Sequence, residues 1–442
     1  MRLENEMTPD EKIISLAEAL RDAREGGNTA DMLAALAELG QAYLAEGDAP
    51  KALTQFDEGL NLAQEQNDLE AESQFLGLRG LALRDIGNFN RALNQFQKSN
   101  RIAKKINHPL LVCDSYFQMA RLLSEKGNTT KALSNLSKAM KIAVDQDDQK
   151  RKMRIANLFA DTFYQEQAFE KAIKYYLLAN EIAEELHNPK AACSFLTKAG
   201  NVYLVHEAYR SAIEQYERAL HLADRLEDAR AEMHILGGLF RAHARQGEVG
   251  LALMYADRAI DAAQTIGHLE AEIANLQALI SYLMEESKFE EALPYIERCF
   301  DLADQQNDHQ LQRSMALLSG FCHYNLGQHD AALQAYNQAI ELAVRFQDRL
   351  AEASGLSRKS AILADMGDLD QALQIARLGL QKAEQEGDES LIGELQALLA
   401  FTYQDLGDVD NAKAYTQAAI ETYQALGEDA QVELLEGWLE QV

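Results

Sequence analysis

Residues 29–68 read TADMLAALAELGQAYLAEGDAPKALTQFDEGLNLAQEQND, and the pattern of this stretch recurs along the whole chain. Within it, Ala52 marks a small-residue position that returns every 40 residues without insertion or deletion. The positions in this series are Ala52, Ala92, Ala132, Ala172, Ala212, Ala252, Ala292, Ala332, Ala372 and Ala412. A fixed period of this length indicates a repeat protein, in which each unit buries its apolar face on its neighbours.

Each alanine of this series begins a helical face of interleaved small and large residues. In the quoted stretch Gly59 and Ala63 follow Ala52 by seven and eleven residues, which places all three on one side of a helix. Leu53 and Phe56 lie between them, and most other periods carry aliphatic or aromatic residues at the same two positions. This alternation predicts close packing against a second helix, with ridges in grooves.

Two breaks divide each period into two helices of about 16 to 18 residues. The first break is a glycine position, Gly47 in the quoted stretch, where a residue of positive φ ends one helix. The second is polar, Asn67-Asp68, and supplies a cap for the next helix. Pro109 and Pro189 directly follow this second break, where proline suits the first turn of a helix. No strand pattern competes.

The pattern resembles the tetratricopeptide repeat, W-x2-L-G-x2-Y followed by A-x3-F and P. The residues that match it in the quoted stretch are Leu36, Leu39, Gly40, Tyr43, Ala52 and Phe56. The chain departs from that pattern because the closing proline is absent and the period is 40 residues. In this it resembles the repeats of kinesin light chains, spindle-orientation scaffolds and peptide-sensing bacterial regulators; HEAT and armadillo repeats have similar lengths but lack these ordered positions.

The resemblance implies an all-α fold, a right-handed superhelical α-solenoid of ten helix-turn-helix repeats. We expect residues 1–10 to be disordered or poorly ordered and residues 11–442 to form a single solenoid domain. Within it, we expect a capping helix over 11–28, ten repeats over 29–428 and a C-terminal capping helix over 429–442. Terminal helices shield a face that has no neighbouring repeat.

Composition narrows the classes of partner. The formal charge is -28, from 42 Lys and Arg against 70 Asp and Glu, and such a surface repels nucleic acid and anionic membranes. The four cysteines lack CxxC or metal-type spacing, and the N-terminus lacks an apolar signal core, so we expect a cytoplasmic protein. We find no phosphate-binding loop, histidine cluster or convincing acid/base pair, and expect neither an enzyme nor a bound cofactor or metal.

The resemblance also implies that the first helix of each repeat lines the concave groove of the solenoid. Its groove positions are 34, 37, 41, 44 and 45, with their equivalents every 40 residues. The candidate peptide-binding residues at these positions are Phe117, Arg121, Arg154, Asn157, Tyr164, Asn201, His234, Arg241, Arg245, Phe321, Tyr324 and Asn325.

The candidates suggest how a peptide would be held. The groove positions of repeats two to six hold five arginines and four acids, namely Arg84, Arg121, Arg154, Arg241 and Arg245 against Asp85, Asp114, Glu125 and Asp161. Arginines would bind acidic side chains of an extended or helical peptide, asparagines its backbone, and aromatic residues its apolar anchors. The alternative is that these arginines pair with neighbouring acids and serve structure alone.

Three functions remain open at this point. The first is a non-enzymatic scaffold or adaptor for protein–protein interaction, monomeric or weakly dimeric, that binds a segment of another protein. The second is a regulatory sensor whose solenoid changes pitch when it binds a peptide. The third is an oligomeric structural element that associates through exposed helix faces.

Overall fold

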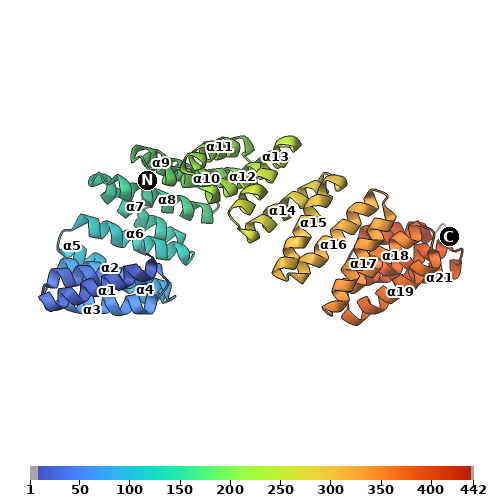
Figure 1. Cartoon of the computed structure of the whole chain (residues 1–442), viewed down its shortest axis with the longest axis horizontal. Coiled ribbons are helices and arrows are strands. Elements are labelled where there is room, and N and C mark those ends of the chain that lie inside the picture. Colours follow the sequence, from blue (N-terminus) through green and yellow to red (C-terminus); the bar gives the residue numbers. More distant parts are fainter. Residues whose placement is uncertain (1–7, 440–442) are drawn as a thin grey trace. The chain divides into compact units, whose positions relative to one another are not determined.

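The computed structural model describes residues 8–439, which form 22 α-helices and no strand. The first helices of the ten repeats are α2 (Thr29–Ala45), α4 (Leu69–Asp85), α6 (Pro109–Glu125), α8 (Gln149–Gln165), α10 (Pro189–Val205), α12 (Ala229–Arg245), α14 (Leu269–Glu285), α16 (His309–Asn325), α18 (Arg349–Asp365) and α20 (Glu389–Asp405). The second helices are α3 (Ala49–Glu65), α5 (Phe89–Lys105), α7 (Thr129–Asp145), α9 (Phe169–Glu185), α11 (Tyr209–Leu226), α13 (Val249–Thr265), α15 (Phe289–Gln306), α17 (His329–Arg345), α19 (Leu369–Glu386) and α21 (Val409–Leu426). The predicted all-α fold of helix-turn-helix repeats is confirmed (Figure 1).

Capping helices stand at both ends of this series. Helix α1 (Pro9–Gly26) starts two residues before the boundary expected from the sequence, because the side chain of Thr8 caps it and Glu11 completes the capping box. Helix α22 (Asp429–Leu439) fills the expected C-terminal position. Residues 1–7 and 440–442, which the sequence assigns to the N-terminal segment and to the end of this cap, lie outside the described residues.

The chain divides into two compact units, one ending at Glu248 and the other beginning at Val249. The first unit contains α1 to α12 and the second α13 to α22, so the division falls at the turn inside the sixth repeat. In each unit the helices follow one another as antiparallel neighbours (Figure 1). The single continuous domain expected from the unbroken period stays a prediction.

The turn between the two helices of a repeat requires a left-handed residue. Gly47 takes φ +77° there, as predicted, and the other glycines of this position also have positive φ. In three repeats a residue with a side chain adopts the same conformation: Gln167, Glu207 and Ser287 have φ of 58°, 60° and 55°. The turn geometry is therefore set by the packing of the helices and persists where the sequence lacks glycine.

The glycine position in the first helix allows the two helices of a repeat to approach closely. A Cβ atom on Gly200 of α10 would lie 2.7 Å from Cε1 of Tyr216 on α11. Gly238 of α12 covers the other side of the same ring, where a Cβ atom would lie 2.6 Å from Cζ. Tyr216 is completely buried between them, and Gly40 and Phe56 repeat the arrangement in the first repeat.

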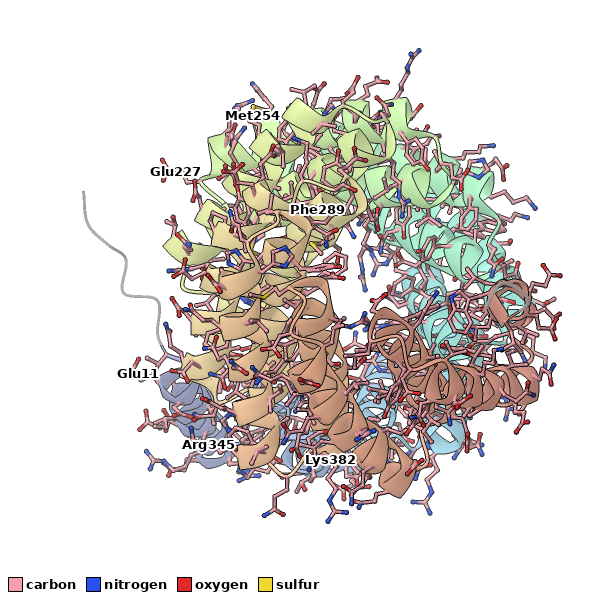
Figure 2. All side chains as sticks on the ribbon, turned by 90° about the vertical axis from the view of Figure 1, so that its right-hand side faces the viewer. Glu11, Glu227, Met254, Phe289, Arg345 and Lys382 are labelled. Carbon is pink, nitrogen blue, oxygen red and sulfur yellow. The ribbon has the colours of Figure 1, made fainter. Side chains whose placement is uncertain are left out.

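Consecutive first helices of the first unit also touch one another: α2 touches α4, α4 touches α6, α6 touches α8, and α10 touches α12. The surface made by exposed residues of α4, α6, α8, α10 and α12 is called here the inner face. The second helices form the other side of the unit, called here the outer face. Figure 2 shows charged side chains projecting from helix surfaces, with the exposed Glu11 on α1 and Arg345 on α17 labelled.

Candidate functional site

The twelve candidate residues all lie on first helices, but they belong to two units. Nine of them, from Phe117 to Arg245, lie on α6, α8, α10 and α12 of the first unit. The other three, Phe321, Tyr324 and Asn325, lie on α16 of the second unit. Each set is therefore described by itself.

Two of the five arginines follow the alternative of local pairing. Arg84 contacts its neighbour Asp85, with 2.7 Å between Nη2 and Oδ1. Arg121 contacts Glu125 one turn later on α6, with 3.2 Å between Nε and Oε1. Each of these two pairs neutralises an acid of the inner face within its own helix. We therefore assign Arg84 and Arg121 a structural role.

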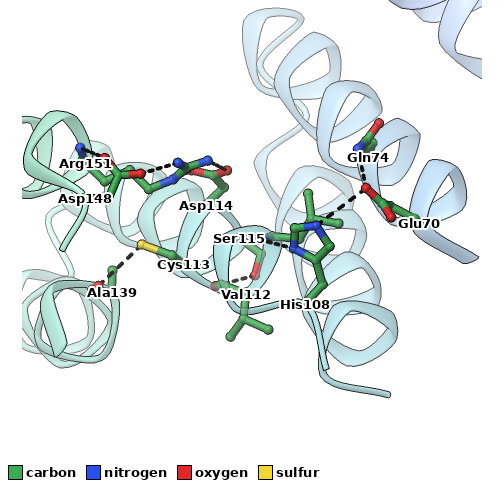
Figure 3. Close-up of polar contacts among 11 residues, drawn as sticks. Glu70, Gln74, His108, Val112, Cys113, Asp114, Ser115, Ala139, Asp148 and Arg151 are labelled. Atoms are coloured by element: carbon green, nitrogen blue, oxygen red, sulfur yellow. Dashed lines mark hydrogen bonds and ion pairs between the residues drawn. The ribbon is translucent and has the colours of Figure 1, made fainter. Parts of the chain in front are cut away.

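Asp114 is held by an arginine that is not among the candidates. Arg151 at the start of α8 donates to Asp114 of α6 through both Nε (2.9 Å) and Nη2 (2.7 Å), as Figure 3 shows. Its Nη1 donates to Asp148, the N-cap of α8, at 2.6 Å. Hydrogen bonds from Arg151 hold the pKa of Asp148 below its usual value, and bonding to Asp114 raises the pKa of Arg151. Arg151 thus clamps the third repeat to the fourth.

Asp161, the fourth acid, is held by three side chains. It accepts hydrogen bonds from the hydroxyl of Tyr176 and from Nζ of Lys198, the latter at 3.1 Å. Asn157 donates to Asp161 at 3.2 Å and accepts from Lys198 at 2.9 Å. Both ends of the Asn157 amide are therefore occupied, and we expect this residue to position Lys198 and Asp161 rather than to bind a peptide backbone.

Three of the five arginines, Arg154, Arg241 and Arg245, have no carboxylate partner within residues 8–439. The Arg154 guanidinium lies over the half-buried ring of Phe117, 4.8 Å from its centroid. Arg241 donates from Nε to the carbonyl oxygen of Gly237 at 3.2 Å, and Arg245 is exposed one turn further along α12. Because all four acids are already neutralised, these three arginines leave an excess of positive charge on the inner face.

Asn201 of α10 and Arg241 of α12 both lie near the hydroxyl of Tyr216. Tyr216 reaches through the repeat from α11 and donates its hydroxyl to Oδ1 of Asn201 at 2.6 Å. Burial raises the pKa of Tyr216 to about 12, so this hydroxyl keeps its proton at neutral pH. The nearby positive charge of Arg241 opposes that shift. His234 is exposed on the same helix as Arg241, and Asn201 keeps its amide Nδ2 for a ligand.

Aromatic candidates are partly accessible in both units. Tyr164 is 41% exposed and its ring centroid lies 6.0 Å from that of Phe169. In the second unit Phe321 is 40% exposed and packs edge-on against Phe289 at 5.8 Å. Tyr324 donates its hydroxyl to Asp365, and Asn325 donates to the carbonyl oxygen of Phe321 at 2.8 Å.

The cysteines are buried, and the side chains that could bind a metal ion are not clustered within residues 8–439. All four cysteines are buried and unbonded to one another, and burial raises the pKa of Cys113 and of Cys322 to about 11. Residues 8–439 hold no group of three or more His, Cys, Asp or Glu side chains placed to bind a metal ion. None of the helices in this range is both long and apolar enough to cross a membrane.

The fold and the inner face define an all-α helical-repeat protein with a positively charged first-helix surface. Residues 393–425 match the tetratricopeptide repeat family model, in agreement with the repeat pattern of the sequence. Residues 81–229 match the model of the soluble NSF attachment protein. Residues 28–73 and 278–351 match that of anaphase-promoting complex subunit 5. No curated protein matches the chain in sequence.

Solved structures resemble the chain at low sequence identity. BtubC from P. vanneervenii is 20% identical, with 60% of this chain and 94% of that chain covered and a TM-score of 0.42. The quorum sensor NprR from B. thuringiensis in its apo form is 15% identical, with 76% and 97% covered and a TM-score of 0.45. A signal transduction ATPase with a tetratricopeptide repeat sensor from Pyrococcus horikoshii is 14% identical, with 78% and 55% covered and a TM-score of 0.45.

Proposed function

We propose that this chain is a non-enzymatic protein-interaction scaffold, and that the inner face of its first unit binds a peptide or helical segment of a partner. The observation that carries the proposal is the group of three inner-face arginines, Arg154, Arg241 and Arg245, that lack carboxylate partners. An arginine without a carboxylate partner keeps most of its five donors for a ligand, and Arg241 uses only its Nε, which donates to the carbonyl oxygen of Gly237.

The surroundings of these arginines suggest acidic residues in the bound segment. Arg154 is fixed over Phe117, so its guanidinium plane is oriented before a ligand arrives and loses less freedom on binding. Arg241 and Arg245 are exposed one turn apart on α12, where two carboxylates of a helical segment, also one turn apart, would meet both. Phe117 and Tyr164 supply apolar surface to the same segment.

Charge reversal on the inner face tests the proposal. An array of acidic and neutral peptides of about 15 residues would be incubated with the wild-type chain and with the variant Arg154→Glu, Arg241→Glu. We expect acidic peptides to be retained by the wild type and weakened at least about tenfold by the variant. The matched control is Arg210→Glu with Arg225→Glu, which reverses two exposed arginines of the second helix α11.

Equal retention by both variants would contradict the proposal, provided that circular dichroism shows the two variants equally helical. The sensor alternative makes a further demand, because a ligand that bridges Arg154 in the fourth repeat and Arg241 in the sixth would tie α8 to α12. Small-angle scattering of the chain with a retained peptide would then show compaction, whereas a scaffold binds without it.

A further inference from the structure

A basic segment stands out in this acidic chain. Residues 89–141 contain ten Lys and Arg against two Asp and Glu, a formal charge of +8, so the rest of the chain carries -36. Eight of these cations lie on the consecutive second helices α5 and α7, and all eight are exposed. They are Arg91, Lys98, Arg101, Lys104, Lys105, Lys131, Lys138 and Lys141.

None of these eight cations forms an ion pair with a carboxylate in the part of the chain that the structure describes. Two of them instead share one aromatic ring. The ring belongs to Tyr116 of α6. Lys104 donates a hydrogen bond to the Tyr116 hydroxyl at 2.7 Å, and its Nζ lies 4.9 Å from the ring centroid. Lys138 of α7 lies 5.4 Å from the same centroid. Tyr116 therefore lies between α5 and α7 and contacts one lysine from each of these two helices.

The repeat register shows why two lysines at this place are unusual. Lys104 and Lys138 are 34 residues apart and lie on the second helices of consecutive repeats. At two other places in the first unit the same pair of positions holds opposite charges. Arg24 and Glu58 lie 2.5 Å apart, and Glu184 and Arg218 lie 3.2 Å apart. Between α5 and α7 the same geometry brings like charges together, an arrangement that an anion placed between them would stabilise.

The basic surface is limited in extent. Helix α3 on one side carries Asp57, Glu58 and Glu65, and helix α9 on the other ends in Glu184-Glu185. A helix of 17 residues is about 25 Å long, so the cations occupy two such helices and no more. A cavity of about 680 Å³ at its margin is lined by residues of α3, α4 and α5, which include Asp57 and Glu72 as well as Lys98 and Arg101.

We propose that this basic outer face, defined by the eight cations and Tyr116, is a second docking surface, which binds a short acidic segment of a partner protein. A carboxylate of that segment lies between Lys104 and Lys138. Arg91, Lys98 and Lys105 recur every seven residues, about 10.5 Å along α5, and so do Lys131 and Lys138 on α7. A helical partner with acidic residues every seven positions has the same spacing. A long nucleic acid or a membrane would meet the acids of α3 and α9 at both borders.

The test uses the full chain and a fluorescein-labelled helical peptide of about 20 residues. The peptide carries glutamate at every seventh position and at the position next to each of these. We expect fluorescence anisotropy to show binding that weakens with added salt, and Lys104→Ala with Lys138→Ala to weaken it at least about tenfold. The matched control is Lys174→Ala with Lys413→Ala, two exposed lysines outside this surface, which should change binding less than about twofold. The lysine variant loses the contacts with Tyr116 and the repulsion between the two lysines together, so circular dichroism should show it as helical as the wild type.

Equal affinity of the lysine variant and the wild type would overturn the proposal. Tighter binding of single-stranded DNA of matched charge, or of vesicles that contain phosphatidylserine, would overturn the choice of a polypeptide as occupant. In a chain that already carries Arg154→Glu with Arg241→Glu, which removes binding of acidic segments at the inner face, the two lysine substitutions should still weaken binding at least about tenfold. Failure of the outer face can thus be told apart from failure of the function proposed above.

Discussion

Replacing Gly200 by alanine should destabilise the first unit, although alanine is the better helix former. Alanine in a helix interior gains about 0.5–1 kcal/mol over glycine. Against this, its Cβ atom would lie 2.7 Å from Cε1 and 2.8 Å from Cδ1 of Tyr216. Ordinary carbon contacts are about 3.5–4.0 Å, so the methyl group overlaps the ring by about 1 Å.

Tyr216 has no space into which it can move. Gly238 of α12 lies on the opposite side of the ring, and the hydroxyl is bonded to Asn201 at 2.6 Å. Overpacking a filled core costs about 1–3 kcal/mol, so the steric cost exceeds the gain in helix propensity. The net loss is about 1–2 kcal/mol, or about 2–6 °C in melting temperature for a unit of this size.

Gly77 offers the matched comparison, because a Cβ atom there would lie 4.0 Å from its nearest contact, Oγ of Ser99. Gly77→Ala should therefore raise the melting temperature while Gly200→Ala lowers it, both measured by differential scanning calorimetry of the full chain. Hydrogen exchange of α10 to α12 should show the loss of protection locally in Gly200→Ala. A Gly200→Ala chain as stable as Gly77→Ala would refute the packing explanation.

Three further substitutions probe the turn within a repeat and the ion pairs of Arg151. Glu207 has φ +60° at a position where most repeats have glycine. Glu207→Gly should therefore raise the melting temperature by relieving about 1 kcal/mol of backbone strain. Gly127→Ala, at φ +71°, should lower the melting temperature for the same reason. Arg151→Met should cost about 2 kcal/mol at pH 7, through lost charge-assisted bonds to Asp114 and Asp148. The folded-state pKa of Asp148 is lowered, so its contribution is present above its ordinary value of 3.8 and disappears as the pH falls further. The deficit of Arg151→Met in thermal unfolding should therefore shrink below about pH 4, and a constant deficit would count against this assignment.

The fold was predictable from the sequence because its main determinant is the size of side chains at a fixed interval. Ala52 and its equivalents, the glycine before seven of the second helices and the polar cap residue before each first helix all act within one repeat. Sequence-local signals of this kind fix helix ends to within a few residues. Gln167, Glu207 and Ser287 were not predictable as left-handed residues, because in these repeats tertiary packing imposes a conformation that the residue itself disfavours.

The candidate site was predictable in its location and less so in its charge balance. Arg84 and Arg121 find acids within their own helix, which sequence alone allows as an alternative. Asp114 and Asp161 are instead neutralised by Arg151 and Lys198, each 37 residues further along the chain. That interval is one period less about one helical turn, and a search for opposite charges at this separation is the signal that would have found both pairs.

The outer face was missed because a net charge summed over 442 residues conceals a local excess of the opposite sign. A charge count over windows of about one period would have shown the excess, whereas the pairing of Lys104 with Lys138 requires the 34-residue register of the second helices, and therefore the structure. One helix supplies both surfaces, since α6 carries Phe117 and Arg121 on the inner face and Tyr116 on the outer face. A rigid helix with a single arrangement does not transmit binding energy between its two sides. The inner face and the outer face are therefore expected to bind their segments independently, so that one chain holds two partners at once.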